Sequence, residues 1–325
     1  RTLVLALALA LVAVACGDDD ASTDATVTTQ AASAATATTG ATTATTGAVT
    51  ATGTNTAVTD TDGCPDGNFL IEAVNSYEQS GDYPDPELAV NCAGGTLIVE
   101  TNNIPNFEFV QMTPNALAAQ DNTYEIPLDP TERATEGAMG LGQVGVSVSG
   151  LDIFAAYEAP NDGYRDPFLD GLLDFCNGHT AQAGQYHFHA RFDCIFDNPD
   201  TVGLVFGYLF DGYEMVSPWV CANDGCTETR QVASSYVRVD ENSLSAFEAW
   251  EFQAGSGDLD ICNGMTGSDG IYRYYITDEF PYVPFCFHGE TTYAQGDFVG
   301  EAPAGGGGPN AAGGPGGGAP PPPGG

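Results

Sequence analysis

The sequence predicts a mainly β, loop-rich domain that is held together by disulfides and flanked by disordered segments. Short runs of alternating or β-branched residues, bounded by Gly, Pro, Asn and Asp, recur through the middle of the chain, at residues 96–100, 144–148, 204–210 and 234–239. Long helical periodicity is absent, so we expect only short helices, near residues 167–175 and 242–252. An even set of cysteines in the same part of the chain is typical of disulfides in an exported protein.

Two segments resemble each other and predict an internal duplication. Residues 176–189 read CNGHTAQAGQYHFH, and residues 262–275 read CNGMTGSDGIYRYY. The likeness extends to the preceding residues, where 144–154 align with 206–216. The two units therefore span about residues 140–196 and 202–289. Two units are too few for a solenoid. We therefore predict two halves packed about a pseudo-twofold axis, with a groove between them as the natural place for a site.

The first residues resemble an export signal. The apolar run at residues 3–14 is too short to span a bilayer but has the length of a signal-peptide core, which makes residues 1–16 a signal peptide. Residues 13–16, Ala-Val-Ala-Cys, resemble a bacterial lipobox, although Ala stands where such boxes usually carry Leu. In that case Cys16 is lipidated and anchors the protein to a membrane; the alternative is an ordinary signal peptide cleaved near Ala15. Since no Met begins the sequence, we expect it to start a few residues late. Both alternatives predict a protein of the cell envelope, lipid-anchored or secreted.

Composition predicts where the folded domain lies. Residues 17–62 are rich in Ala and Thr, and residues 301–325 are rich in Gly and Pro, so neither segment can bury enough apolar surface to order itself. The first is expected to be a disordered tether and the second a disordered tail, with the folded domain at residues 63–300. The formal net charge of −37, from 44 acidic residues against seven arginines, disfavours binding to nucleic acid.

The cysteine positions within the repeats predict the disulfide pairs. In each unit a Cys-Asn-Gly is followed by a second cysteine close to a Phe, which favours a bridge within each unit. The predicted pairs are Cys176 with Cys194, Cys262 with Cys286, Cys221 with Cys226, and Cys64 with Cys92. A thiolate metal site is the alternative, but only Cys221 and Cys226 are close neighbours, and their spacing is not that of a CxxC motif.

Three of the chain's four histidines lie in the first unit. Residues 186–192 alternate strictly, so in a strand the aromatic side chains face the core, and His187 and His189 share the opposite, polar face, about 6.5–7 Å apart. Two imidazoles on one face can bind a single metal ion, and His179 and His288 are further candidate ligands. Neutral imidazoles suit zinc, copper, iron or nickel, and we favour copper or zinc. The alternative is a surface strand whose histidines only form a hydrogen-bond network.

The second unit replaces the three histidines by Met265, Arg273 and Tyr275. We therefore expect one metal ion, bound mainly by the first unit. The Asn and Gly of the Cys-Asn-Gly motif occur in both units and are predicted to form turns with left-handed backbone angles: Asn177, Gly178, Asn263 and Gly264. Asp174, which precedes the first Cys-Asn-Gly, could cap its loop or orient a histidine. Asp211 is a second carboxylate of interest, although Asp-Gly is most often only a turn.

Several of these motifs together resemble the YHYH-domain family, named for its Tyr-His-Tyr-His motif. They are Asp-Phe-Cys-Asn-Gly-His at residues 174–179, Tyr-His-Phe-His at 186–189, Phe-Asp-Gly-Tyr at 210–213 and Phe-Pro-Tyr followed by Cys-Phe-His-Gly within 280–289. The resemblance covers residues 96–289 and implies an exported location and a shared fold, but no reaction. The second motif, often also histidine-bearing in the family, is Tyr-Arg-Tyr-Tyr here.

Two functions of different classes follow from the sequence. One is a surface-anchored domain that binds one transition metal. The other is a non-catalytic module of the cell envelope that binds a glycan or a protein through aromatic residues such as Trp219, Tyr164 and Tyr213. The chain has no Gly-x-Ser-x-Gly elbow, no phosphate loop and no His-Glu-x-x-His, so no reaction is predicted.

Overall fold

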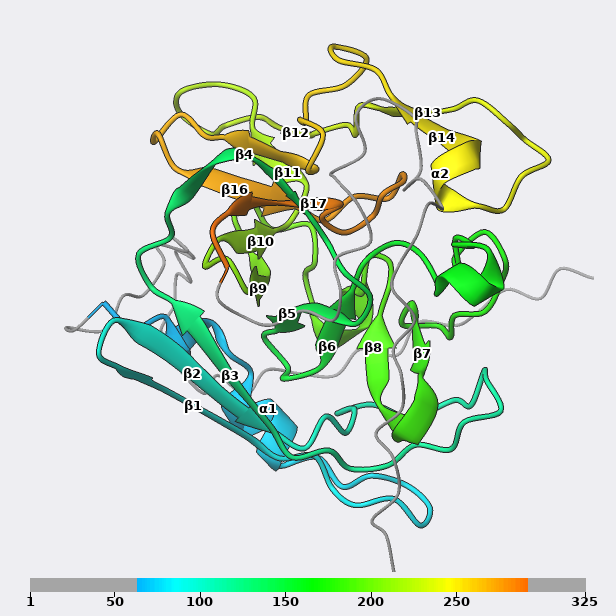
Figure 1. The fold of residues 1–325 in the computed structure, drawn as a ribbon. Coiled ribbons are helices and arrows are strands. Elements are labelled where there is room, and N and C mark those ends of the chain that lie inside the picture. The colour runs from blue at the N-terminus through cyan, green and yellow to red at the C-terminus, as the bar shows by residue number, and fades with distance from the viewer. Residues whose placement is uncertain (1–62, 292–325) are drawn as a thin grey trace, which may run out of the picture. The chain divides into compact units, whose positions relative to one another are not determined.

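The computed structural model describes residues 63–291, in which 17 strands are joined by long loops and very short helices (Figure 1). The mainly β class is thereby confirmed. The predicted signal peptide, the lipidated Cys16, the tether at residues 17–62 and the tail at 301–325 lie outside the described residues. Within residues 63–291, none of the helices has the length and apolar character needed to cross a bilayer.

A three-stranded antiparallel sheet begins the domain. Its strands are β1 (Leu88–Ala93), β2 (Thr96–Thr101) and β3 (Asn122–Pro127), and the short helices η1 (Asp66–Asn68) and α1 (Ile71–Asn75) precede them. The turn between β1 and β2 consists of Gly94 and Gly95, both with positive φ, as a two-residue hairpin requires. The Cys64–Cys92 disulfide ties the chain before η1 to β1.

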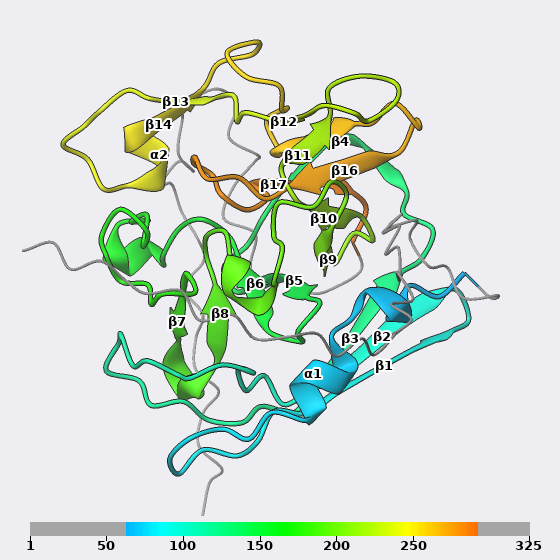
Figure 2. The ribbon, with the colours of Figure 1, turned by 180° about the vertical axis from the view of Figure 1, so that it is seen from behind.

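An eight-stranded sheet forms the centre of the domain. Its strands are β5 (Gln143–Ser147), β6 (Asp152–Phe154), β7 (Gly178–Thr180), β8 (Tyr186–Phe188), β9 (Val205–Leu209), β10 (Glu214–Val216), β15 (Gly264–Thr266) and β16 (Tyr272–Tyr275). Their order is β15-β16-β10-β9-β5-β6-β8-β7, so that the β7–β8 hairpin lies at one edge and the β15–β16 hairpin at the other. Figure 2 shows, from behind, β7 and β8 on one side of this sheet and β16 on the other.

The pairing directions in this sheet are the same when it is followed from the centre to either edge. β5 pairs antiparallel with β9 at the centre. From β5 outward the pairs are antiparallel, parallel and antiparallel, and from β9 outward they are again antiparallel, parallel and antiparallel. This connectivity is consistent with two units related by a pseudo-twofold axis, and the duplication itself stays a prediction.

Two apolar cores lie on the two faces of the central sheet. On one face, Leu97 and Ile126 of the three-stranded sheet belong to the same cluster as Val146 and Tyr208. On the other face, Tyr186 and Phe188 of β8 belong to a cluster with Phe192, Phe206, Tyr274 and Phe287. The prediction that the aromatic side of the 186–192 segment faces the core is confirmed, because all of its aromatic side chains are fully buried.

Short two-stranded pairs and turns complete the domain. They are β4 (Glu132–Ala138) with β17 (Cys286–Gly289), β11 (Trp219–Cys221) with β12 (Thr229–Gln231), and β13 (Tyr236–Arg238) with β14 (Trp250–Phe252). The short helices are η2 (Pro160–Asp162), η3 (Gln182–Gly184), η4 (Asp193–Ile195) and α2 (Ala246–Ala249). Thus α2 lies within the helix expected at residues 242–252, whereas residues 167–171 form turns that Gly171 ends with a φ of 70°.

The disulfides join the same four pairs that the repeats and spacings predicted. Cys176 is bonded to Cys194, and Cys262 to Cys286, at corresponding places in the two units. Cys221, the last residue of β11, is bonded to Cys226 within the loop that leads to β12. Four disulfides in the described residues indicate an oxidising compartment outside the cytosol.

Candidate metal centre

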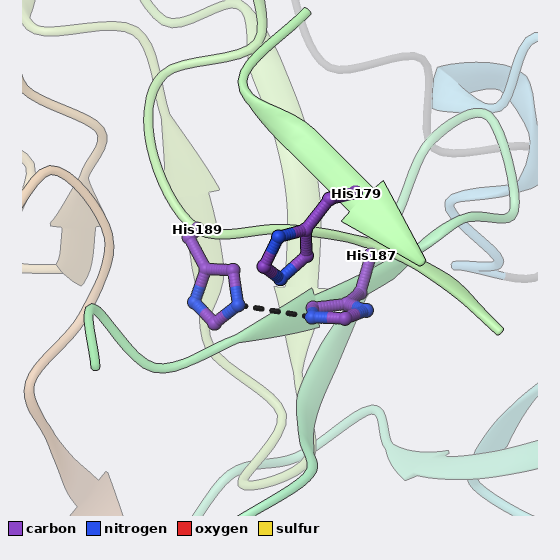
Figure 3. A group of neighbouring side chains, drawn as sticks. All are labelled: His179, His187 and His189. Atoms are coloured by element: carbon purple, nitrogen blue, oxygen red, sulfur yellow. Dashed lines mark hydrogen bonds between the residues drawn. The ribbon is translucent and has the colours of Figure 1, made fainter. Parts of the chain in front are cut away.

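Three histidines meet on the β7–β8 hairpin at one edge of the central sheet (Figure 3). His179 of β7 stands directly opposite His187 of β8, and His189 follows two residues later on the same face. The sequence predicted a polar face here. In the structure this face is covered: the exposed fractions of His179, His187 and His189 are 4%, 2% and 1%, and the Phe154 ring stacks on His187 with centroids 3.8 Å apart.

The loop before β7 is shaped by Asp174 and Asn177. One oxygen of Asp174 accepts hydrogen bonds from the backbone N–H groups of Cys176 at 2.9 Å and Gly178 at 3.1 Å, and the Tyr186 hydroxyl donates to the same carboxylate. Asn177 takes the predicted left-handed conformation with a φ of 62°. Asp174 therefore supports the loop that carries His179, and its own oxygens are engaged by these three donors.

Gly178 has a different role from the one predicted. It lies in β7, and no left-handed φ requires glycine there. Instead, a Cβ at this position would overlap the Tyr186 hydroxyl and lie 2.5 Å from Cζ of that ring. Gly264 relates to Tyr272 in the same way in the second unit. Each glycine thus leaves the space in which a buried tyrosine reaches its aspartate, Asp174 or Asp260.

Every imidazole of the cluster directs its Nδ1 atom to a backbone carbonyl. The distances are 3.2 Å from His179 Nδ1 to the Leu172 oxygen, 3.2 Å from His187 Nδ1 to the Gln185 oxygen and 2.6 Å from His189 Nδ1 to the Ala155 oxygen. A carbonyl only accepts hydrogen bonds, so each Nδ1 carries the hydrogen. In the neutral rings Nε2 then holds an unshared electron pair, and such contacts fix the tautomer and orientation of histidine ligands in metal sites.

The three Nε2 atoms converge on one point. The candidate ligand atoms of the three rings all lie within 4.8 Å of one another, and His187 Nε2 is 2.9 Å from His189 Nε2. Two nitrogens that both present electron pairs repel each other at this distance unless a proton or a cation lies between them. The arrangement can therefore bind a metal ion, or it can share a proton.

Glu158 adds a carboxylate that the sequence did not reveal. Its Oε1 atom lies 3.1 Å from His179 Nε2 and 3.6 Å from His189 Nε2. This oxygen is shielded from solvent, and among the described residues no N–H or O–H group donates a hydrogen bond to it. A buried acceptor without a donor is costly, and a cation in front of it removes that cost. No repeat or motif marks Glu158, because it lies in the irregular segment between β6 and η2.

The electrostatic surroundings keep His187 and His189 neutral and Glu158 charged. Burial lowers the pKa of His187 well below its ordinary value, and the neighbouring His189 and His179 add to this effect. Burial also lowers the pKa of His189, to about 4. Burial by itself would raise the pKa of Glu158, but the adjacent His179 and His189 lower it below its ordinary value. At neutral pH the site therefore offers the neutral imidazoles of His187 and His189 and an anionic oxygen, the forms that bind metal ions.

The other predicted site residues lie in the second unit. The structure does not bring His288 to the three histidines: its ring stacks on Tyr272, with centroids 3.6 Å apart, and packs against Tyr213. Asp211 accepts hydrogen bonds from the Tyr274 hydroxyl at 2.5 Å and from the Gly289 N–H at 2.9 Å, so it ties β17 to the sheet. The cluster thus lies within the first unit rather than in a groove between the two.

The hairpin of the second unit carries no comparable set of donors. Met265 stands opposite Arg273 in the same register as His179 and His187. The Arg273 guanidinium pairs with Glu214 at 3.1 Å and with Asp269 at 2.8 Å. The Arg273 side chain therefore supplies the positive charge at the position that corresponds to His187. This agrees with the expectation that a histidine site lies mainly in the first unit.

Comparison with known proteins gives one match. A family model described as YHYH protein matches residues 123–289, slightly more than half of the 325 residues. The match includes the whole central sheet and all four histidines. No curated protein and no solved structure matches the chain.

Proposed function

We propose that this chain, which belongs to the YHYH protein family, binds one transition-metal ion through His179, His187 and His189, with Glu158 as the fourth donor. The observation that carries the proposal is the convergence of three hydrogen-free Nε2 atoms and one donor-free carboxylate oxygen. The Glu158 oxygen is buried without a donor, and Nε2 atoms that carry no hydrogen cannot donate to it or to one another, so one cation would compensate all four atoms.

The distances between the donors suit a small ion with four ligands. Zinc binds nitrogen and oxygen ligands at about 2.0–2.2 Å, which places the donors of a tetrahedral site roughly 3.3 Å apart. The separations of 2.9 Å between His187 and His189, 3.1 Å between His179 and Glu158, and 3.6 Å between His189 and Glu158 lie around this value. Three imidazoles and one carboxylate suit zinc or copper, and a filled set of four protein donors is typical of an ion held for structure, storage or electron transfer.

The competing function of the same residues is a proton-sharing network. In that case one imidazole is protonated at Nε2 and donates to its neighbour or to Glu158. The depressed pKa values of His187 and His189 oppose this alternative for those two rings near neutral pH, because they disfavour a second proton on either of them. A proton shared between His179 Nε2 and Glu158, whose atoms lie 3.1 Å apart, is the form of the network that competes with a metal ion.

Elemental analysis of the full-length protein, purified without a histidine tag, tests the proposal. We expect about one zinc or copper ion per chain, or uptake of one when Zn²⁺ or Cu²⁺ is added. The His187→Ala/His189→Ala double variant should lose the ion. His288→Ala is the matched control, since it removes the histidine that lies outside the cluster, and it should keep the ion. A native protein that neither contains nor takes up either metal would refute the proposal, as would equal metal loss in the control.

We further propose that Cys16 carries a lipid that anchors the domain to a membrane, so that the metal centre lies at the outer face of the cell envelope. The disulfides support an exported location. The net charge of −37 supports a partner other than nucleic acid. A Cys16→Ala variant expressed in bacteria should appear in the soluble fraction, and retention of this variant in the membrane fraction would contradict lipid anchoring.

A further inference from the structure

The second unit contains a cavity at the position that corresponds to the metal centre. Its volume is about 680 Å³, within the usual range for small-molecule sites. Met265, Arg273 and Tyr275 line it, and these residues stand where the first unit has its three histidines. The same place on the two hairpins is therefore a metal cluster in one unit and an open cavity in the other.

The charged groups of the cavity are paired with one another. Arg230 and Arg273, two of the chain's seven cationic residues, line it together with Glu214 and Asp269. Arg273 pairs with both of these acids, and Arg230 pairs with Asp258 at 2.8 Å. Because each guanidinium is already neutralised, the cavity has no excess positive charge to attract an anion. The negative charge of the whole chain disfavours an anion further.

Aromatic and apolar groups form the remainder of the lining. Trp219 and Tyr275 lie beside Val205, Val216 and Val220. The Trp219 indole N–H has no acceptor in the part of the chain that the structure describes. Aromatic rings offer flat apolar contact, whereas carboxylates accept and guanidinium groups donate hydrogen bonds in fixed directions. A sugar ring has the complementary chemistry: an apolar face of C–H groups and a rim of hydroxyls that both donate and accept.

We propose that this cavity binds a segment of an uncharged oligosaccharide. Trp219 and Tyr275 provide the apolar contacts, and Glu214, Asp269 and Arg273 bind the hydroxyls. The proposal is independent of the metal centre, because no ligand of that centre lines the cavity. It makes the second unit the part of the protein that contacts a polysaccharide of the cell surface or its surroundings.

Binding to purified hexasaccharides tests the proposal. The probes are chitohexaose, cellohexaose, maltohexaose and mannohexaose, with a galacturonic acid hexamer as the anionic counterpart, each titrated by calorimetry and by tryptophan fluorescence. We expect at least one neutral probe to bind and to change the fluorescence. Trp219→Ala should weaken it roughly tenfold or more, as expected when a central aromatic contact is removed. Phe175→Ala is the control, since Phe175 is 62% exposed, does not line the cavity and should not affect binding.

A second variant, Ser268→Trp, tests the cavity even if Trp219→Ala does not fold. Ser268 is an exposed residue that lines the cavity, so Ser268→Trp should obstruct it without disturbing the core. Loss of binding in Ser268→Trp, with metal content and disulfides unchanged, would support the cavity as the site. The proposal is overturned if none of the neutral probes binds at about 10 mM, if the anionic hexamer binds more tightly than all of them, or if Ser268→Trp binds as the unmodified protein does.

Discussion

Substituting Gly178 by alanine should disturb the proposed metal centre without changing a proposed ligand. The new methyl group would overlap the Tyr186 hydroxyl. Since the Tyr186 side chain is fully buried, its ring can move away only by shifting β7 from β8. His179 follows Gly178 directly, so its Nε2 atom would move away from those of His187 and His189.

The expected loss of stability can be estimated from these contacts. Overpacking in a filled core costs about 1–3 kcal/mol. The displaced hydroxyl also loses its hydrogen bond to the charged Asp174 carboxylate, at 2.9 Å, which is worth about 1.5–3 kcal/mol. Alanine also lowers the conformational entropy of the unfolded chain, which stabilises the folded variant by about 0.4–1 kcal/mol. The free energy of unfolding should therefore fall by about 2–5 kcal/mol, and the metal affinity by about 10–100-fold, as is typical when the support of a ligand is lost.

The second unit offers a matched control. In Gly264→Ala the Cβ would overlap the Tyr272 hydroxyl, which donates to Asp260 at 3.0 Å. Urea unfolding should therefore show a similar loss of stability in both variants, while metal titration should show weaker binding in Gly178→Ala alone. The reasoning is refuted if Gly178→Ala is within about 0.5 kcal/mol of the unmodified protein, or if the two variants lose metal equally.

Three further predictions concern pH and the disulfide around the site. Burial raises the pKa of Asp152 to about 7 from an ordinary 3.8, so the folded state holds this proton more tightly. Urea unfolding should therefore show stability falling by roughly 4 kcal/mol between about pH 4 and 7, and a pH dependence unchanged in Asp152→Asn would argue against this assignment. In metal-free protein the lowered pKa values of His187 and His189 have the opposite effect on stability, which they decrease as the pH falls. The unfolded chain binds protons at these histidines more readily, so His189 alone should cost chelator-treated protein about 3 kcal/mol of stability as the pH falls from about 6.5 towards 4, and bound metal should delay this loss. The measurement is made in Asp152→Asn, where the opposing effect of Asp152 is absent, and a pH-independent transition in that variant would count against the assignment. Removing the Cys176–Cys194 bridge, which spans 18 residues and encloses all three histidines, should lower the free energy of unfolding by about 3 kcal/mol and weaken metal binding; calorimetry with metal titration would contradict this if both stayed unchanged.

Local patterns in the sequence were enough to predict the class of the fold and much of its bonding. Alternation with a period of two identified the core side of the segment at residues 186–192. The repeated Cys-Asn-Gly identified two of the disulfides, and the left-handed Asn177 follows from the same motif. His179, His187 and His189 could be grouped because a hairpin brings together residues that are close in sequence.

Other parts of the site come from segments that no local pattern connects. His288 was a reasonable candidate ligand, but β17 pairs with β4 and places its ring against Tyr272. The alternation of β8 predicted which residues share a face, and it carried no information about what covers that face. The face is covered by Phe154, the last residue of β6, and by Glu158, from the loop that follows β6.

The sequence by itself determined that this is a disulfide-bonded β protein with three histidines on one hairpin. Backbone periodicity and cysteine spacing act over short distances along the chain, and both can be read without knowledge of the fold. Only the tertiary structure decided that the histidines are buried, that the carbonyls of Leu172, Gln185 and Ala155 turn their Nε2 atoms inward, and that Glu158 faces them. The physical reason is that the tautomer and charge of a buried imidazole are set by the groups packed around it, and the fold brings most of those groups from elsewhere in the chain.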